Sequence, residues 1–153
     1  MAQRSRALYQ VIQNVRSTFH QLKALGDELH ADRGITTAMR AVMESLAEAG
    51  EQTVPHMARA KSVSRQHIQI NVDMLAKAGH VRLRNNPGHK RSPFINLTRK
   101  GRATFASMRR REQAPLERIA KEFRVKELFT ASDTLARLKH RIVAVRTKGG
   151  TDD

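Results

Sequence analysis

The sequence predicts a mostly α-helical fold of the α+β class, with one small β-hairpin near the middle and additional helices at both ends. Two patterns carry this expectation. Apolar residues recur at three- and four-residue steps over most of the chain, which is the period of amphipathic helices. Residues 81–98 instead alternate apolar and polar side chains on both sides of a turn-rich centre, as a hairpin does. A length of 153 residues suits one domain with extra helices.

The first part of the chain predicts three helices. Residues 5–30 form a long helix in which every third or fourth residue is apolar. Thr36 begins a second helix over 36–49, and Pro55 lies in the first turn of a short third helix through Ala60. The residues expected to face the core from the second helix are Ala38, Val42, Met43 and Leu46.

A fourth helix and the hairpin follow. Either Ser62 or Ser64 caps the fourth helix, and Gly79 closes it after residue 78. Apolar and polar residues then alternate through 81–84 and 94–97, with an Asn-Asn-Pro-Gly turn after the first run. This pattern predicts two strands joined by a charged tip.

Two more helices complete the chain. Thr98 caps a fifth helix, and Pro115 is expected to kink and restart it. A sixth helix is expected to begin at Thr130 or Ser132 and to run to about Val145.

The helices at the two ends have apolar faces that so small a central domain cannot fully cover. The sixth helix carries a coiled-coil-like seam spaced 3, 4 and 3, formed by Leu135, Leu138, Ile142 and Val145. The two faces can pack on each other within one chain, or together across the two-fold axis of a homodimer. We favour the homodimer.

The net charge of +15 lies almost entirely in a central basic block. Residues 52–111 hold fourteen Lys and Arg and one acid, Asp73, whereas 1–51 carry no net charge and 112–153 carry a net +2. A concentrated positive field favours a polyanionic partner, usually nucleic acid. A basic surface kept for solubility is the alternative, but it would spread its charge more evenly.

Several classes of protein do not fit this composition. The absence of cysteine excludes disulfides, thiol-based redox sensing and cysteine metal sites. No apolar run approaches the roughly 18 residues of a membrane helix, and the N-terminus lacks a secretory signal, so we expect a cytoplasmic protein with no membrane partner. No histidine pair with metal-ligand spacing, P-loop, nucleophile elbow or paired-carboxylate signature is present. We therefore expect no metal, no cofactor and no enzymatic activity.

The order of helix, short helix, helix and hairpin over 36–97 is that of a helix-turn-helix followed by a β-wing. In the helix over 64–78, Ile68, Val72 and Leu75 share one face and are expected in the core. The opposite face can enter the major groove of double-stranded DNA, where the N-terminal turns of such a helix reach base edges. The candidate contacts are Ser64, Arg65, Gln66, Gln69 and Ile70.

Each candidate on this helix has a DNA partner that its chemistry suits. Gln66 and Gln69 can pair bidentately with adenine, Arg65 can reach guanine or a phosphate, and Ile70 can contact a thymine methyl group. Ser64 can donate to a phosphate, which the helix dipole favours. The alternative is an ordinary solvated face. The basic block and the wing favour DNA.

The hairpin is the second candidate contact. A hairpin with a charged tip can lie along the minor groove, where a narrow A·T-rich stretch attracts an inserted arginine. Lys90 at the tip and Arg84 at the end of the first strand are expected at phosphates.

Two segments of the sequence resemble the MarR family of bacterial and archaeal transcription regulators. They are SVSRQHIQINVDMLAKAGHV, residues 62–81, and HKRSPFINLTRKG, residues 89–101. The family's typical version reads VSRQ…VD.L…G.V and D.R…V.LT..G. The resemblance extends over nearly the whole chain and is specific between the SRQ and LT motifs. It implies a dimeric winged helix-turn-helix repressor or activator, often tuned by small aromatic or phenolic ligands.

The resemblance also implies roles for individual residues. Arg91 matches the wing-tip arginine and is expected in the minor groove. The effector pocket of the family lies between the dimerisation helices and the winged domain, and its walls here would include Phe19, His20, Leu22 and Met43. Core packing is the alternative for each of these four residues.

Four positions depart from the pattern of the family. His89 stands where an aspartate normally orients an arginine, so Arg91 must be positioned otherwise, with Ser92 as the candidate. Asn71 lies near the core face and requires a hydrogen-bond partner. Ile70 and Met74 stand where basic residues are frequent.

These expectations divide the chain into an N-terminal dimerisation helix (1–34), a winged helix-turn-helix DNA-binding domain (35–100), C-terminal dimerisation helices (101–147) and a disordered tail (148–153). The alternative function is that of a non-specific nucleoid or RNA-binding basic protein, which would use the same basic block. An enzyme or ligand carrier would need a convergent polar site that the sequence lacks. A winged domain used only for protein contacts would not explain the basic block.

Overall fold

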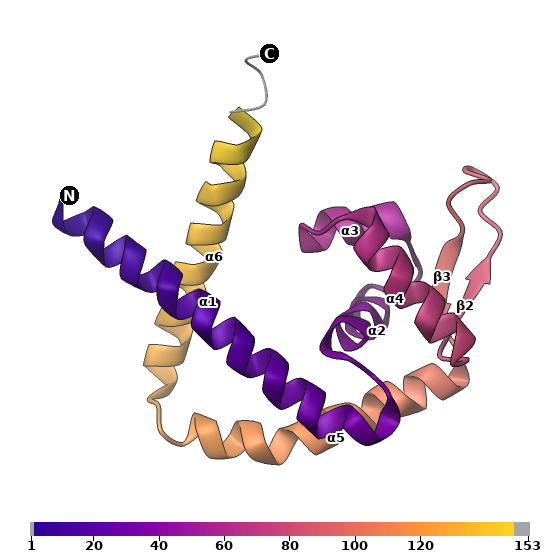
Figure 1. Ribbon diagram of the computed structural model, residues 1–153, viewed down its shortest axis with the longest axis horizontal. Coiled ribbons are helices and arrows are strands. Elements are labelled where there is room, and N and C mark those ends of the chain that lie inside the picture. Colours follow the sequence, from indigo (N-terminus) through magenta and orange to yellow (C-terminus); the bar gives the residue numbers. More distant parts are fainter. Residues whose placement is uncertain (1, 149–153) are drawn as a thin grey trace. The chain divides into compact units, whose positions relative to one another are not determined.

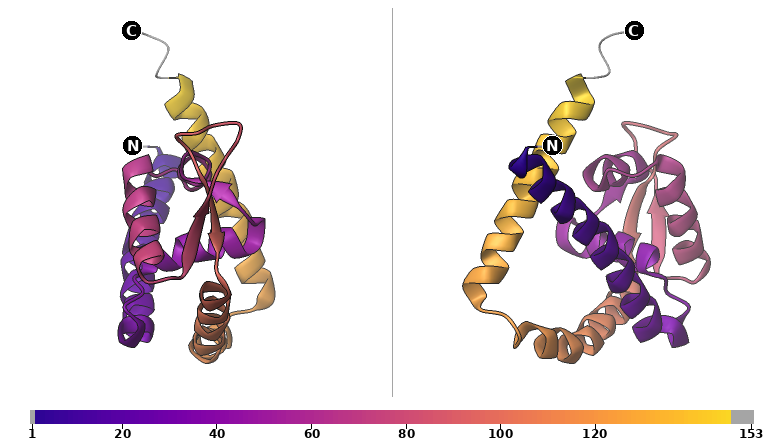
Figure 2. Two further views of the ribbon diagram at one scale, coloured as in Figure 1. Left: turned by 90° about the vertical axis from the view of Figure 1, so that its right-hand side faces the viewer. Right: turned by 60° about the vertical axis from the view of Figure 1, so that its left-hand side comes forward.

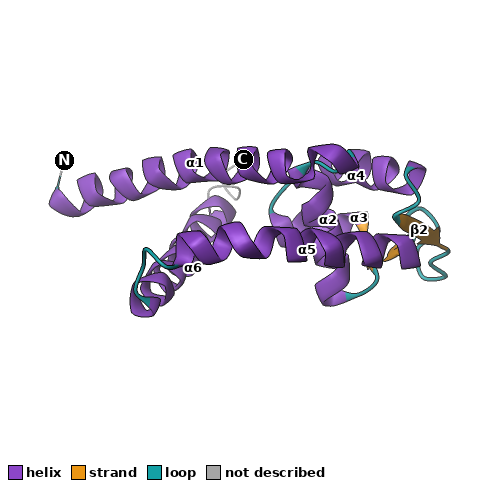
Figure 3. Ribbon diagram, turned by 90° about the horizontal axis from the view of Figure 1, so that it is seen from below, coloured by secondary structure: helices purple, strands orange, loops and turns teal. Residues whose placement is uncertain are grey.

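The computed structural model describes residues 2–148 and is built mostly of helices, with three short strands (Figure 3). This confirms the predicted fold class. In chain order the elements are α1 (Gln3–His30), the 3-10 turn η1 (Ala31–Arg33), α2 (Thr37–Ala49), β1 (Gln52–Thr53), α3 (Val54–Lys61), α4 (Arg65–Lys77), β2 (Val81–Arg84), β3 (Phe94–Leu97), α5 (Arg99–Ala120) and α6 (Val125–Lys148). The chain forms two compact units, Met1–Glu112 and Gln113–Asp153. The predicted disordered tail lies outside the described residues, except for Lys148 at the end of α6.

Hydroxyl caps begin the three helices of the central domain. The side chains of Thr36, Thr53 and Ser64 each accept a hydrogen bond from the backbone N–H three residues further on. Each bond satisfies a donor that the first helical turn leaves free. Of the two candidate caps for α4, Ser64 is the cap, whereas Ser62 ends α3 in the left-handed conformation at φ 55°. Gly79 ends the turn after α4 at φ 77°.

The hairpin is present as predicted, and a third strand extends it. β2 and β3 pair antiparallel, with Val81 opposite Leu97 and Leu83 opposite Ile95. The unpredicted strand β1 pairs with the other edge of β3, giving the order β1-β3-β2. The loop between β2 and β3 extends beyond the paired strands (Figure 2). The expected apolar face is incomplete: Leu83 is 50% exposed, because it lies towards the tip of the edge strand while Val81 lies at its buried start.

The core of the first unit is formed by α2, α3, α4, the sheet and the start of α5. Ile68, Val72 and Leu75 are buried as predicted. On α2 the expectation for Ala38 was wrong: it is only half-buried, and the longer side chain of Met39 occupies the core instead. The other core residues of α2 are Val42, Met43 and Leu46, as predicted. Asn71 is buried, and its Nδ2 donates to the carbonyl of His67 at 2.7 Å, which supplies the required partner.

The fifth helix packs tightly against the turn between α4 and β2. Thr98 caps it as predicted, accepting from the N–H of Gly101 at 3.0 Å. A Cβ atom added at Gly101 would lie 2.0 Å from the carbonyl oxygen of His80, so only glycine fits this approach. The expected restart at Pro115 was wrong, because α5 continues through it to Ala120. Proline removes a single N–H from the ladder, and the helix is continuous on both sides of it.

The sixth helix begins five residues earlier than the first predicted start. Arg124 donates its backbone N–H to the side chain of Glu127 at 2.8 Å, and this contact caps the helix at Val125. The hydroxyl of Thr130 instead donates to the carbonyl of Lys126 inside the helix, at 2.8 Å. Thr130 was therefore a misleading start signal.

Candidate nucleic-acid interface

The helix-turn-helix and the wing form one continuous side of the first unit. Figure 1 shows α3, α4 and the β2–β3 hairpin side by side, and α4 contacts both α3 and β2. The predicted contacts on α4 come from its cap and first two turns. All five are exposed: Ser64, Arg65, Gln66, Gln69 and Ile70.

Three features of α4 favour an anion at its N-terminus. The first turn contains no acidic side chain, and the helix dipole places partial positive charge there. Arg65 adds a full charge at the same position. The arrangement suits a phosphate group at the start of the helix.

The two glutamines of α4 differ in their surroundings. Gln69 Nε2 donates to Asp73 Oδ1 at 2.8 Å, one turn further along the helix. Within residues 2–148, Gln66 makes no side-chain hydrogen bond to the protein, so both its donor and its acceptor can face a base edge. Asp73 thus fixes the orientation of the Gln69 amide, a contact that was not predicted.

The wing tip is ordered by backbone and asparagine contacts. Asn86 Nδ2 donates to the carbonyl of Ser92 at 2.9 Å, and its Oδ1 accepts from the N–H of Gly88 at 3.2 Å. The Lys90 and Arg91 side chains at the tip are exposed. Ser92 bonds through its backbone, and in the described part of the chain its side chain makes no hydrogen bond to Arg91.

Arg84, expected at a phosphate, is held by an acid that sequence reasoning missed. Its Nε donates to Glu51 Oε2 at 3.0 Å, and its Nη2 donates to Glu51 Oε1. Its guanidinium carbon lies 5.2 Å from the ring centroid of Phe94. No local signal pairs Glu51 with Arg84, because 33 residues separate them.

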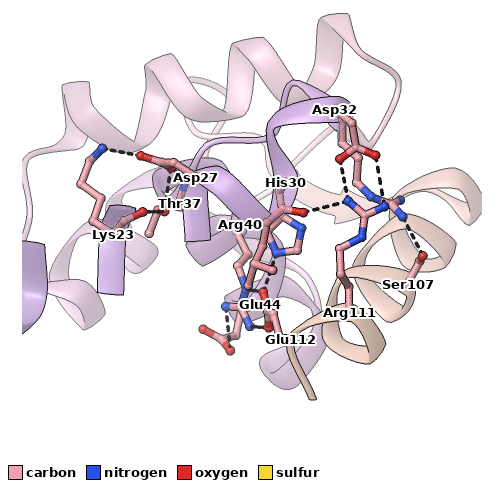
Figure 4. A network of polar contacts seen from close by, with 12 residues as sticks. Lys23, Asp27, His30, Asp32, Thr37, Arg40, Glu44, Ser107, Arg111 and Glu112 are labelled. Carbon is pink, nitrogen blue, oxygen red and sulfur yellow. Dashed lines mark hydrogen bonds and ion pairs between the residues drawn. The ribbon is translucent and has the colours of Figure 1, made fainter. Parts of the chain in front are cut away.

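A second polar network lies where α1, α2 and α5 meet (Figure 4). Glu112 accepts from buried His30 Nε2 at 2.7 Å and from Arg40 Nη2 at 2.6 Å. Burial raises the pKa of Glu112, but the hydrogen bonds from Arg40 and His30 outweigh burial and leave it below its ordinary value. Asp32 pairs with Arg111 near the same junction. The network ties the end of the first helix to α2 and α5.

The four predicted effector residues do not share one environment. Phe19 is 61% exposed and contacts His20 edge-on, with ring centroids 5.8 Å apart. Leu22 is exposed on the same helix, whereas Met43 is fully buried. Met43 therefore packs in the core, which was the alternative interpretation for each of the four residues.

Neither a metal site nor a membrane-spanning helix is found among the residues that the structure describes. Among them, no group of three or more His, Cys, Asp and Glu side chains is placed to hold a metal ion. In the same residues, no helix is both long and apolar enough to cross a membrane.

Comparison with known proteins identifies the fold. No protein-family model matches the chain. An uncharacterised protein of Mycobacterium tuberculosis and one of Mycobacterium bovis are each 30% identical over 127 residues, covering 83% of this chain and 86% of theirs. A solved MarR-family transcription regulator is 26% identical with a TM-score of 0.79, covering 94% of this chain and 95% of its own.

Two further solved structures are similar and contain DNA. A mutant of Escherichia coli MarR complexed with operator DNA is 21% identical with a TM-score of 0.77, covering 86% of this chain and 95% of that one. Reduced AbfR bound to DNA is 20% identical with a TM-score of 0.78, covering 93% and 99%. Such neighbours are DNA-binding regulators and not enzymes. The winged arrangement of α2 to β3, the motifs of α4 and the wing, and these similarities agree: the chain has the winged helix-turn-helix fold of the MarR-family transcription regulators.

Proposed function

We propose that the protein is a cytoplasmic, sequence-specific transcription regulator that binds a pseudo-palindromic DNA site as a homodimer. The observation that carries this proposal is the joint exposure of the α4 N-terminus and the wing tip within the basic block of residues 52–111. A major-groove helix and a minor-groove probe side by side suit duplex DNA.

In this function α4 contacts base edges in the major groove, and the wing recognises the shape of the minor groove. Gln66 and Gln69 are assigned to base edges, with Gln69 oriented by Asp73. Arg65 and the Ser64 cap are assigned to the DNA at the helix start, and Ile70, 52% exposed, to a thymine methyl group. In the wing, Arg91 is assigned to the minor groove and Lys90 to a phosphate.

The exposed apolar side chains support the homodimer. In the second unit, no side chain from 113 to 147 is buried, although its helices are rich in apolar residues. Large exposed patches of this kind mark interaction surfaces. The exposed residues at the two ends of the chain are Leu8, Tyr9, Val15, Phe19, Leu22, Leu116, Ile119, Phe123, Val125, Leu128, Phe129, Leu135, Ile142, Val143 and Val145.

A second copy can cover these faces through the helices of 1–34 and 101–147, which leaves 35–100 as the DNA-binding domain. The two α4 helices would then enter major grooves about one helical turn, roughly 34 Å, apart. We further assign Phe19, His20 and Leu22 on α1 to a site for a small aromatic or phenolic effector. Titration of the protein–operator complex with a panel of phenolic acids tests this assignment, since an effector lowers operator affinity.

The experiment that decides the function is selection of bound duplexes from a random DNA pool by the purified protein. An enriched inverted repeat is the expected result, and its position relative to a promoter then distinguishes repression from activation. The competing function is non-specific nucleoid or RNA binding, which the basic block also suits. That function predicts no enriched site and equal affinity for random duplexes at the same salt concentration.

A further inference from the structure

We propose that Glu51 and Arg84 form an internal latch that fixes the wing. In this latch Glu51 is a positioning residue, and Arg84 does not contact a DNA phosphate. The inference deepens the proposed function, because it rests on the wing being a DNA contact. It concerns the outward face of the three-stranded sheet, where the latch lies.

The latch connects three separate segments of the chain. Glu51 directly precedes β1, which pairs with β3 through Gln52 opposite Ile95. The carboxylate accepts from Asn96 Nδ2 on the central strand at 2.6 Å. It also accepts from Arg84 Nε at 3.0 Å and from Arg84 Nη2, at the far edge of the sheet. One side chain therefore spans all three strands.

The position of the latch gives it control over the tip. Arg84 and Phe94 are the last pair of the β2–β3 ladder, so they flank the loop that carries Arg91. The Arg84 guanidinium is held on both sides, by the two Glu51 oxygens and by the Phe94 ring at 5.2 Å. The direction in which the tip leaves the sheet is set at this pair.

The acid must come from outside the wing. Residues 74–111 contain no Asp or Glu, and His89 stands at the position where the resemblance leads one to expect an aspartate. Glu51 supplies a carboxylate to the base of the wing from the turn between α2 and β1. The Arg84 hydrogen bond lowers the pKa of Glu51, and the Asn96 bond adds to this effect, so the latch is ionised at neutral pH.

The test compares operator affinity and its salt dependence for Glu51→Gln, Arg84→Ala and the double variant. Arg82→Ala is the control for the loss of one arginine from the same strand and face: Arg82 lies opposite Asn96 and makes no hydrogen bond or ion pair in the described residues, and its charge is the smallest of the effects that lower the pKa of Glu51. We expect Glu51→Gln and Arg84→Ala each to weaken binding about three- to tenfold. The salt slope should stay unchanged. The double variant should bind the operator as tightly as whichever single variant has the lower affinity.

A phosphate-binding Arg84 gives the opposite pattern and would overturn the inference. Arg84→Ala would then reduce the salt slope by about 0.9, and Glu51→Gln would tighten binding by freeing Arg84 and removing a negative charge near DNA. A coupled variant adds a readout that general destabilisation does not imitate. In the Glu51→Gln protein, Arg91→Ala should cost less affinity than in the wild type, because the tip is already misdirected; equal losses would contradict the latch.

Amide hydrogen exchange of the free protein separates this inference from the proposed function. Glu51→Gln should accelerate exchange in β2 and β3 next to the tip and leave α4 unchanged, whereas Arg82→Ala should alter neither. Unchanged exchange in the Glu51→Gln wing refutes the latch even if an operator is found. If exchange is faster in the Glu51→Gln wing but the protein selects no operator, the latch is supported as a structural contact. The proposed function, and with it the role of the wing in DNA binding, is then contradicted.

Discussion

His30 Nε2 lies 2.7 Å from Glu112 Oε1, although 82 residues separate them in the sequence. His30 ends the long first helix and Glu112 lies in the middle of α5, with Arg40 of α2 bonded to the same carboxylate. The pair and Arg40 therefore hold the end of α1, α2 and α5 in fixed relation within the first unit. A partly buried carboxylate with two nitrogen partners is expected to matter for stability.

Replacing Glu112 by Gln should lower the free energy of unfolding by about 1–3 kcal/mol, because Arg40 and His30 lose their charged partner. Urea unfolding at neutral pH measures the change. Glu48→Gln is the control, since Glu48 is exposed on α2 and makes no hydrogen bond within residues 2–148. If both variants lose the same free energy of unfolding, the network around Glu112 does not stabilise the fold.

Asp27 should make stability depend on pH in the acid range. Hydrogen bonds from Lys23 and Thr37 lower its pKa from 3.8 to about 2. Because the folded pKa is depressed, its contribution is complete above pH 3.8 and is lost as the pH falls through about 2. The difference in Tm between wild type and Asp27→Asn should therefore shrink between pH 4 and pH 2. A constant difference over this range would show that Asp27 does not titrate as described.

Gly101→Ala should destabilise the first unit by about 2 kcal/mol or more, because the new methyl group meets the carbonyl oxygen of His80 at 2.0 Å. Gly88→Ala at the wing tip is the matched control, since its Cβ would lie 3.5 Å from Asn86 Oδ1, an ordinary contact. Thermal unfolding of both variants should separate them clearly. Similar Tm values would mean that α5 can shift away from the turn at little cost.

The wing contacts should differ in how they respond to salt. Arg91→Ala is expected to weaken operator binding by about 1–3 kcal/mol and to relax preference at the groove it enters. Lys90→Ala should weaken all duplexes alike and reduce the salt slope by about 0.9. Affinities measured at several salt concentrations check both. Operator affinity unchanged by Arg91→Ala would exclude it as the probing residue.

The proposed homodimer should depend on the seam of α6. Ile142→Arg places a charge on this face and should shift the protein to a monomer in analytical ultracentrifugation. His140→Arg adds the same charge to the same helix outside the seam and should leave the dimer intact. A wild-type mass equal to the monomer at every concentration would contradict the dimer itself.

Local chemistry explains what the sequence predicted correctly. The hydroxyl caps at Thr36 and Thr98, the choice of Ser62 or Ser64 for α4, and the alternation of the hairpin act over three or four residues and can be recognised directly. The core face of α4 followed from helical period in the same way. For these reasons the fold and the exposed face of the candidate site were predictable.

Contacts between distant segments explain what was missed. β1 has two residues and exists only because β3 offers it an edge, so no periodic signal precedes it. Glu51 and Arg84, like His30 and Glu112, meet only after the chain has folded. The start of α6 was placed too late, because Thr130 has the side chain of a cap but uses it inside the helix.

The acid-free stretch from 74 to 111 has a consequence for how the protein can respond to its surroundings. Lys and Arg keep their charge throughout the neutral range, and burial, aided by Lys100, lowers the pKa of His80. The Lys and Arg charge that would attract DNA to this surface is therefore constant across the neutral pH range. For the proposed homodimer we therefore expect release from an operator to come from a change in the spacing of its two α4 helices, and not from a loss of Lys and Arg charge.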